Sequence, residues 1–165
     1  MKYIKVEKEK DIKKCSQIAT DIFSEYYSSI LSKNQIDYMV DAFFDINTMK
    51  ESINTNTTYF FIVVENQIIG YLAYILKPDH LYLSKIYLYK EQRHRGYSKK
   101  VFAFIKDKAL EFNKDKIILN VNKNNQIAIN SYEKSGFRKI DEVRIPIGED
   151  YFMDDYVYQF IIEKF

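Results

Sequence analysis

The chain has 165 residues and a mass of 19.8 kDa, which is the size of one globular domain. Hydrophobic residues make up 47% and charged residues 29% of the sequence, which excludes a disordered chain. The formal net charge of +2 is too small to favour nucleic acid as the partner. The composition therefore predicts a single folded domain over residues 1–165.

The cysteine content and the hydropathy pattern bear on the compartment. Cys15 is the only cysteine, which excludes an internal disulfide and favours the cytoplasm. No apolar run approaches the roughly 18 residues of a membrane-spanning helix, and the N-terminus lacks the apolar core of a signal peptide. Because His80 and His94 are the only histidines, we expect neither a metal site nor a Cys–His nucleophile, and Cys15 is predicted to be a small buried apolar residue.

The first half of the chain begins with an alternating strand at residues 2–6, followed by helical apolar spacing from about residue 11. A second helical region starts near residue 33, breaks at 45–47 and resumes to 53. Residues 59–65 and 68–76 are rich in β-branched and aromatic residues, which predicts a hairpin turning at Asn66-Gln67. Gly70, inside the second of these strands, indicates a bulge or the close approach of another backbone.

The second half of the chain alternates strands and helices. Its predicted elements, with a polar run at 90–95, are strands 81–89, 116–121, 137–143 and 153–162 and helices 101–112 and 126–134. Ser135-Gly136 is a typical helix C-terminus. This order predicts an α/β fold (mixed α+β) whose central, mostly antiparallel sheet has six to seven strands flanked by about four helices.

The segment from Lys85 to Lys108 carries eight basic residues against two acids, a surplus of six positive charges. Its polar run precedes a helix N-terminus, where unpaired backbone N–H groups favour a bound anion. A solvated basic helix start is the alternative. The sequence contains neither GxxxxGK[ST] nor GxGxxG, which argues against nucleotide hydrolysis and Rossmann cofactors.

Two motifs in this half carry a family resemblance. The stretch LYLSKIYLYKEQRHRGYSKKVFAFI resembles the acyl-coenzyme A motif of the GNAT N-acetyltransferases, a strand, then Arg/Gln-x-x-Gly-x-Gly/Ala, then a helix. Arg93 and Gly96 match, and Ser98 replaces the last small residue. The stretch NNQIAINSYEKSGF resembles the family's second motif at Asn125, Ala128, Tyr132, Gly136 and Phe137. The resemblance implies the GNAT fold and acetyl-coenzyme A as the acetyl donor.

The resemblance also implies roles for single residues. Backbone groups of Ile86, Tyr87 and Leu88 would pair with the pantetheine arm, and the Leu88 N–H would polarise the acetyl carbonyl. Tyr132 would contact the donor and protonate the leaving thiolate, because a phenol with a pKa of about 10 is protonated at neutral pH. The remaining donor-binding residues implied by the motifs are Arg93, His94, Arg95, Gly96, Tyr97, Ser98, Lys99 and Asn125.

The acceptor side is less defined by sequence. A protonated amine must lose a proton before attack, for which Glu25, Asp79, His80 or a water chain are the candidates. Stretches 17–58 and 139–165 each carry four more acidic than basic residues, which favours a cationic acceptor. The pair Asp154-Asp155 is either a solvated acidic turn or a rim that attracts amines. The predicted substrate contacts are Glu25, Tyr26, Tyr27, Tyr38 and His80.

These features predict transfer of acetyl to a primary amine of a polyamine-like or aminoglycoside-like molecule, or of a peptide N-terminus or lysine. The first alternative is a non-catalytic acyl-coenzyme A-binding or regulatory module of the same fold. The second is an RNA-binding protein that uses the basic segment. An exposed edge of the closing strands favours a homodimer.

Overall fold

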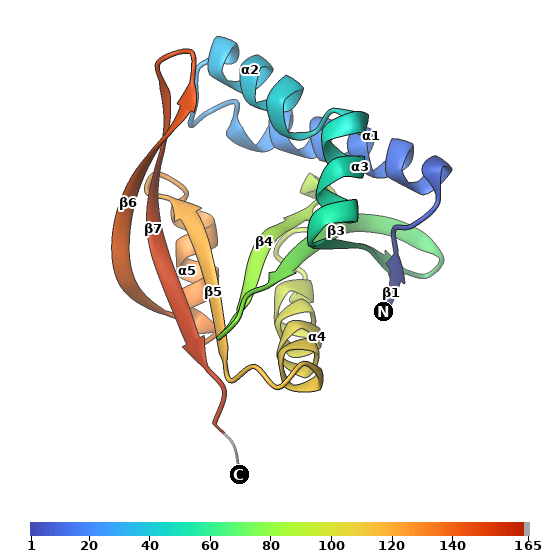
Figure 1. Cartoon of the computed structure of the whole chain (residues 1–165), viewed down its shortest axis with the longest axis vertical. Coiled ribbons are helices and arrows are strands. Elements are labelled where there is room, and N and C mark those ends of the chain that lie inside the picture. The colour runs from blue at the N-terminus through green and yellow to red at the C-terminus, as the bar shows by residue number, and fades with distance from the viewer. Residues whose placement is uncertain (164–165) are drawn as a thin grey trace. The chain divides into compact units, whose positions relative to one another are not determined.

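The structure of the chain, a computed structural model, describes residues 1–163, so the last two residues of the predicted domain 1–165 lie outside it. The chain divides into two compact units. The N-terminal unit comprises residues 1–75 and 85–95, and the C-terminal unit comprises 76–84 and the described residues from 96 onwards. Seven strands form a sheet in the order β1-β2-β3-β4-β5-β7-β6 (Figure 1).

The elements confirm the predicted α/β class with a mostly antiparallel sheet. In chain order they are β1 (Lys2–Lys5), α1 (Glu9–Tyr27), α2 (Lys33–Phe43), α3 (Ile46–Thr55), β2 (Thr57–Val64), β3 (Gln67–Leu76), β4 (Leu81–Leu88), a short 3₁₀ turn η1 (Lys90–Gln92), α4 (Tyr97–Glu111), β5 (Lys116–Asn122), α5 (Gln126–Lys134), β6 (Arg138–Gly148) and β7 (Tyr151–Ile161). Within residues 1–163, no helix combines the length and apolarity needed to cross a membrane.

The region after residue 33 forms two helices, so the described chain has five α-helices rather than about four. The Ser32 hydroxyl accepts a hydrogen bond from the Gln35 N–H at the start of α2. The Asp45 carboxylate accepts from the N–H groups of Asn47 and Thr48 at the start of α3. Because each side chain satisfies N–H groups that lack helical partners, the predicted break at 45–47 becomes a new helix start.

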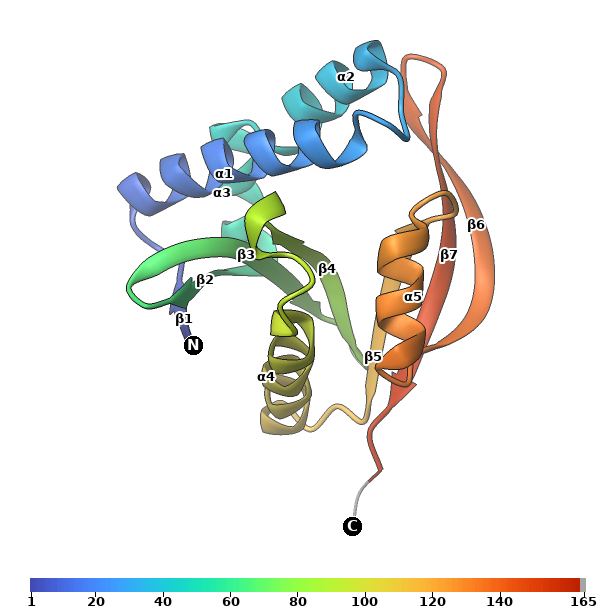
Figure 2. The same ribbon diagram turned by 180° about the vertical axis from the view of Figure 1, so that it is seen from behind.

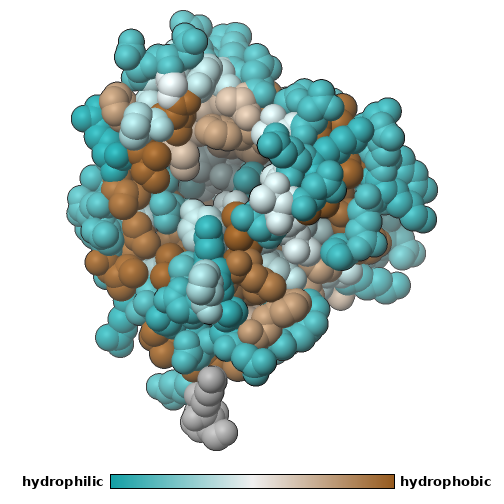
Figure 3. All heavy atoms as spheres, viewed as in Figure 1, coloured by the Kyte–Doolittle hydropathy of each residue, from teal (hydrophilic) through white to brown (hydrophobic). Residues whose placement is uncertain are grey.

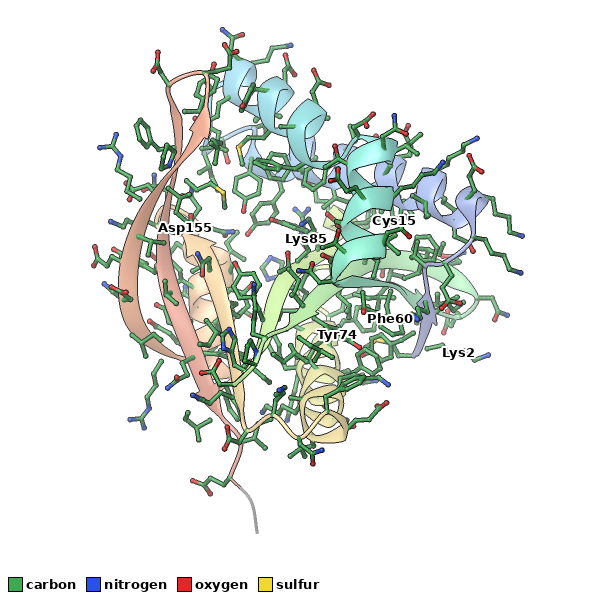
Figure 4. All side chains as sticks on the ribbon, viewed as in Figure 1. Lys2, Cys15, Phe60, Tyr74, Lys85 and Asp155 are labelled. Carbon is green, nitrogen blue, oxygen red and sulfur yellow. The ribbon has the colours of Figure 1, made fainter. Side chains whose placement is uncertain are left out.

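In the N-terminal unit, α1 buries the apolar stripe predicted from its spacing. Its inward residues are Ile12, Cys15, Ile18, Ala19, Ile22 and Phe23. Cys15 is fully buried, which confirms it as a small core residue, and burial raises the pKa of its thiol to about 12. Figures 1 and 2 both show α1 and α3 beside the strands of this unit. Figure 4 labels Cys15 on α1.

The β2–β3 hairpin turns one residue earlier than the sequence predicted. Glu65 and Asn66 occupy the turn with φ of 49° and 63°, and Val64 pairs with Gln67. Two consecutive residues of positive φ match the right-handed twist of a two-residue hairpin. The prediction at Asn66-Gln67 was therefore wrong by one residue, because Glu65 is not a typical residue for the left-handed region.

Gly70 of β3 combines both features that the sequence suggested. The register of β2 and β3 shifts between Ile62 and Val63, opposite this glycine. A Cβ atom on Gly70 would lie 2.1 Å from the Tyr87 carbonyl oxygen and 2.9 Å from the Leu88 Cα. The backbone of β4 therefore approaches β3 as closely as only glycine permits.

Replacing Gly70 with alanine is expected to destabilise the chain by about 1–3 kcal/mol, because the added methyl group meets backbone atoms that cannot rotate away. Chemical denaturation measures this change. Gln67→Ala, at the exposed start of the same strand, serves as the control and is expected to shift stability by no more than about 0.5 kcal/mol. Equal stability of Gly70→Ala and wild type would contradict the close approach.

The C-terminal unit combines parallel and antiparallel pairing. β4 pairs with β5 in parallel at Leu81 and Tyr82, and β5 pairs with β7 in antiparallel fashion along its full length. β6 pairs with β7 and forms the edge of the sheet. Figure 2 shows α5 alongside β5, β6 and β7.

β6 extends to Gly148, beyond the predicted end at residue 143. Pro146 is tolerated there because an edge strand does not need every N–H group for pairing. Apolar side chains gather on the surface of β6 and β7 in Figure 3, and Ile140, Ile145 and Phe152 are each at least 39% exposed. The homodimer inferred from an exposed edge stays a prediction.

Candidate active site

The N-terminus of α4 lies where the sequence predicted an anion site. Gly96 caps the helix with φ of 76°, a conformation that favours glycine, and no side chain caps the N–H groups that follow. The first turn contains no acidic residue and includes Ser98, Lys99 and Lys100. These N–H groups and the helix dipole together favour a negatively charged ligand.

A groove of about 400 Å³ runs between α4 and α5 within the C-terminal unit. It is lined by three lysines, three serines and one aromatic ring, namely Lys99, Lys106, Lys134, Ser98, Ser131, Ser135 and Phe102. The Ser131 and Ser98 hydroxyl oxygens lie 3.5 Å apart across it. This donor set suits a phosphate-bearing ligand, since ammonium and hydroxyl groups both donate hydrogen bonds to phosphate oxygens.

Of the residues that line this groove, only Ser98 and Lys99 were predicted from the sequence to bind the donor. Phe102 and Lys106 follow Lys99 by three and seven residues, so helical spacing places all three on one face of α4. On α5, Lys134 and Ser135 follow Ser131 by three and four residues. That periodicity was the available signal, but it does not reveal which two helices face each other.

The residues of the second motif have structural positions that their identities explain. The Asn125 side chain accepts a hydrogen bond from the Ala128 N–H and so caps α5. Gly136, with φ of 92°, ends the same helix, as predicted. Tyr132 is 9% exposed, and its ring centroid lies 5.7 Å from that of Phe102 and 5.8 Å from that of Phe137.

In the N-terminal unit, Arg93 is held on three sides. Its guanidinium bonds both Glu25 carboxylate oxygens, at 2.6 and 3.3 Å, and lies 4.6 Å from the Tyr26 ring centroid. Its Nε donates to the Leu88 carbonyl oxygen at 3.0 Å. Such a two-pronged pair fixes the end of β4 to α1, and the Glu25 carboxylate is thereby engaged as an acceptor.

Tyr87 of β4 belongs to an aromatic cluster with residues predicted to contact substrate. Its hydroxyl lies 3.4 Å from that of Tyr27, and its ring stacks at 5.8 Å on Tyr71. The Tyr26 ring packs against both Tyr27 and Tyr87. The structure thus brings Tyr26, Tyr27 and Tyr87 together, whereas Tyr38 lies on the neighbouring helix α2.

Asp79 and His80 lie in the turn before β4, in the C-terminal unit. The Asp79 carboxylate contacts His80 Nδ1 at 2.7 Å and Lys116 Nζ at 3.2 Å. These two contacts lower the pKa of the Asp79 carboxyl to about 2, which makes it a weak proton acceptor at neutral pH. Lys116 begins β5, so this pair lies at the opposite end of that strand from Asn122.

Comparison with known proteins identifies relatives in sequence and in fold. An uncharacterized N-acetyltransferase in the pepI 3′ region of Lactobacillus delbrueckii subsp. lactis is 26% identical over 151 residues, covering 86% of this chain and 87% of that protein. The crystal structure of the PaiA N-acetyltransferase from Thermoplasma acidophilum with coenzyme A superposes with a TM-score of 0.78 at 16% identity, covering 98% of this chain and 99% of that one.

A third similar structure is that of a proposed streptothricin acetyltransferase from Bacillus anthracis str. Ames in complex with acetyl-coenzyme A. It is 26% identical with a TM-score of 0.60, covering 69% of this chain and 68% of that one. The model of the acetyltransferase (GNAT) family matches residues 16–137, which is well over half of the sequence. The chain therefore belongs to the GNAT family of N-acetyltransferases.

Proposed function

We propose that this N-acetyltransferase transfers acetyl directly from acetyl-coenzyme A to a primary amine of a small cationic molecule. The observation that carries the proposal is the lysine- and serine-lined groove beside the uncapped start of α4. The solved relatives named above contain coenzyme A or acetyl-coenzyme A, which supports the same donor here. The donor supplies an acetyl group activated as a thioester.

The proposed donor-binding residues are those of the two motif stretches together with the lysines of the groove. Backbone N–H groups of the loop from Arg93 to Lys99 bind the pyrophosphate, and the groove lysines bind the remaining phosphate. Backbone groups of Ile86, Tyr87 and Leu88 pair with the amides of the pantetheine arm. Asn125 holds the start of α5, from which Tyr132 donates a proton to the departing thiolate.

A small cationic acceptor is favoured over a peptide by one relative. The solved structure that is 26% identical is described as a proposed streptothricin acetyltransferase. The surplus of acids in the stretch 139–165 agrees with a positively charged acceptor. A peptide N-terminus or lysine is the second candidate.

The testing experiment is release of free thiol from acetyl-coenzyme A with spermidine, kanamycin, free amino acids and a lysine peptide as acceptors. Turnover with spermidine or kanamycin supports the proposal, and turnover with the peptide alone redirects it to the second candidate. Tight acetyl-coenzyme A binding without thiol release from any acceptor contradicts it and favours the non-catalytic module.

The groove makes a separate prediction about donor affinity. The double variant Lys99→Gln/Lys134→Gln is expected to raise the Kd for coenzyme A about tenfold, because two exposed charge contacts contribute about 0.5–1 kcal/mol each. Calorimetry with dephospho-coenzyme A, which lacks the 3′-phosphate, is expected to show a smaller change. Lys108→Gln is the control, since Lys108 pairs with Glu111 outside the groove. An equal loss of coenzyme A affinity in Lys108→Gln would mean that the phosphate does not bind in the groove.

A further inference from the structure

The C-terminal unit contains one carboxylate whose burial is unusual. Asp155 is 3% exposed, whereas the side chain of its neighbour Asp154 is 54% exposed. Asp155 lies on β7 directly opposite Asn122 of β5 and Val143 of β6 (Figure 4). Directly opposed residues share a face of the sheet, so neither neighbour brings a positive charge to it.

No hydrogen bond or ion pair among the described residues compensates this burial. Among residues 1–163, no hydrogen bond or ion pair reaches the Asp155 side chain. The neighbouring cation, Lys123, contacts Glu142 at 3.0 Å and Asp154 at 3.1 Å. Tyr82 of β4 is the other titratable group close enough to interact. Burial and the Asp154 charge raise the pKa of the Asp155 carboxyl to about 6, opposed by Lys123.

The position of Asp155 agrees with a role toward an acceptor. The Tyr158 hydroxyl donates to Glu133 of α5, so Tyr158 faces that helix. Asp155 is three residues away on the same strand and therefore lies on the opposite face of the sheet. Within this unit, β4 pairs with β5 in parallel at Leu81 and Tyr82, and Asp155 pairs with Asn122, the last residue of β5. Tyr132, whose ring packs on Tyr158, and Asp155 therefore lie on the two sides of the sheet of this unit.

We propose that Asp155 binds the ammonium group of the acceptor and takes its proton before the amine attacks the thioester. This role rests on the proposed acetyl transfer. A buried carboxylate without a partner costs free energy, and an ammonium ligand is the group that offsets this cost. The other candidate acids are less suited, since Glu25 pairs with Arg93 and Asp79 pairs with Lys116.

The proposed step balances in protons and bonds. Asp155 accepts one proton from the ammonium, and the freed lone pair forms the C–N bond as the acetyl C–S bond breaks. Tyr132 donates its hydroxyl proton to sulfur and recovers the second proton that nitrogen releases. Asp155 then gives its proton to solvent, so the products are an N-acetyl amine, a free thiol and one proton.

The test compares the pH dependence of kcat/KM for Asp155→Asn and wild type, with the best acceptor among spermidine, kanamycin and the lysine peptide. Wild type is expected to lose activity below a pH of about 6, where Asp155 is protonated. Asp155→Asn is expected to lower kcat/KM at neutral pH about 10²–10⁴-fold. Its residual activity should rise with pH toward the amine pKa of about 10, because only neutral amine then reacts.

Asp154→Asn is the matched control, since it removes the adjacent carboxylate and leaves Asp155. It should keep most of the activity, with an acid limb at somewhat lower pH, because the Asp154 charge no longer raises the pKa of Asp155. An Asp155→Asn variant that stays within threefold of wild type, or keeps the same acid limb, overturns the proposal and leaves the acetyltransferase function intact. Absence of thiol release by wild type itself overturns the proposed function, and the role of Asp155 with it.

A direct titration removes dependence on the variant's folding. The Asp155 carboxyl carbon, followed by ¹³C NMR in wild type, is expected to titrate near pH 6 and to shift to lower pH when spermidine is added. A titration midpoint below about 4.5 overturns the role. So does a midpoint that stays the same when the acceptor used by the enzyme in the activity assay is added.

Discussion

Replacing Tyr132 with phenylalanine is expected to lower kcat about 10²–10⁴-fold while acetyl-coenzyme A still binds. The substitution removes only the hydroxyl proton that is proposed to neutralise the leaving thiolate. The ring contacts with Phe102, Phe137 and Tyr158 remain, so α5 should stay in place. Thiol release measures turnover, and calorimetry measures donor affinity for the same preparations.

Tyr158→Phe is the matched control for this prediction. It also removes one tyrosine hydroxyl from the C-terminal unit, one that donates to Glu133 at 2.8 Å. Loss of that hydrogen bond is expected to cost about 0.5–1.5 kcal/mol of stability and to leave turnover nearly unchanged. Equal turnover of Tyr132→Phe and wild type would remove Tyr132 from the acid role, and equal loss in both variants would indicate a packing effect.

The motif residues show why part of the site follows from sequence. Gly96, Asn125 and Gly136 each begin or end a helix, and those positions demand particular residue types. Local chain geometry therefore explains these motif residues, and the motif in turn identifies the helix N-terminus where an anion is proposed to bind. The strands and helices were predictable for the same reason, since their apolar spacing is local.

Long-range pairings could not be predicted in this way. Arg93 and Glu25 are 68 residues apart, and nothing in the spacing of either residue indicates the other. The groove could not be predicted for the same reason. The sequence indicates one face of α4 and one face of α5, but it does not show that the two faces lie opposite each other. Asp155 was recognised only as part of an acidic pair, since a sequence does not show that one of two adjacent carboxylates is buried and the other exposed.

The burial of Asp155 predicts an unusual effect on stability. Its carboxyl has a pKa of about 6 in the folded chain and an ordinary value of 3.8 when exposed. The folded state therefore holds this proton more tightly than the unfolded state, so ionisation between pH 4 and 6 lowers stability. Two pKa units correspond to about 3 kcal/mol, which sets the upper limit of this effect.

Asp155→Asn is accordingly expected to stabilise the chain by about 1–3 kcal/mol at pH 7.5 and to leave stability unchanged below a pH of about 4. Urea denaturation of wild type and Asp155→Asn across this pH range measures the difference in stability. Other carboxyls, such as Asp79 with its lowered pKa, make stability fall in acid equally in both proteins, so their contribution cancels in the difference. Asp154→Asn loses an exposed pair with Lys123 and relieves the repulsion of ionised Asp155, so its stability should change by no more than about 1 kcal/mol. If Asp155→Asn gains stability and loses turnover, the Asp155 charge serves catalysis and destabilises the fold. Loss of stability by Asp155→Asn at every pH would instead mean that the carboxylate supports the native structure.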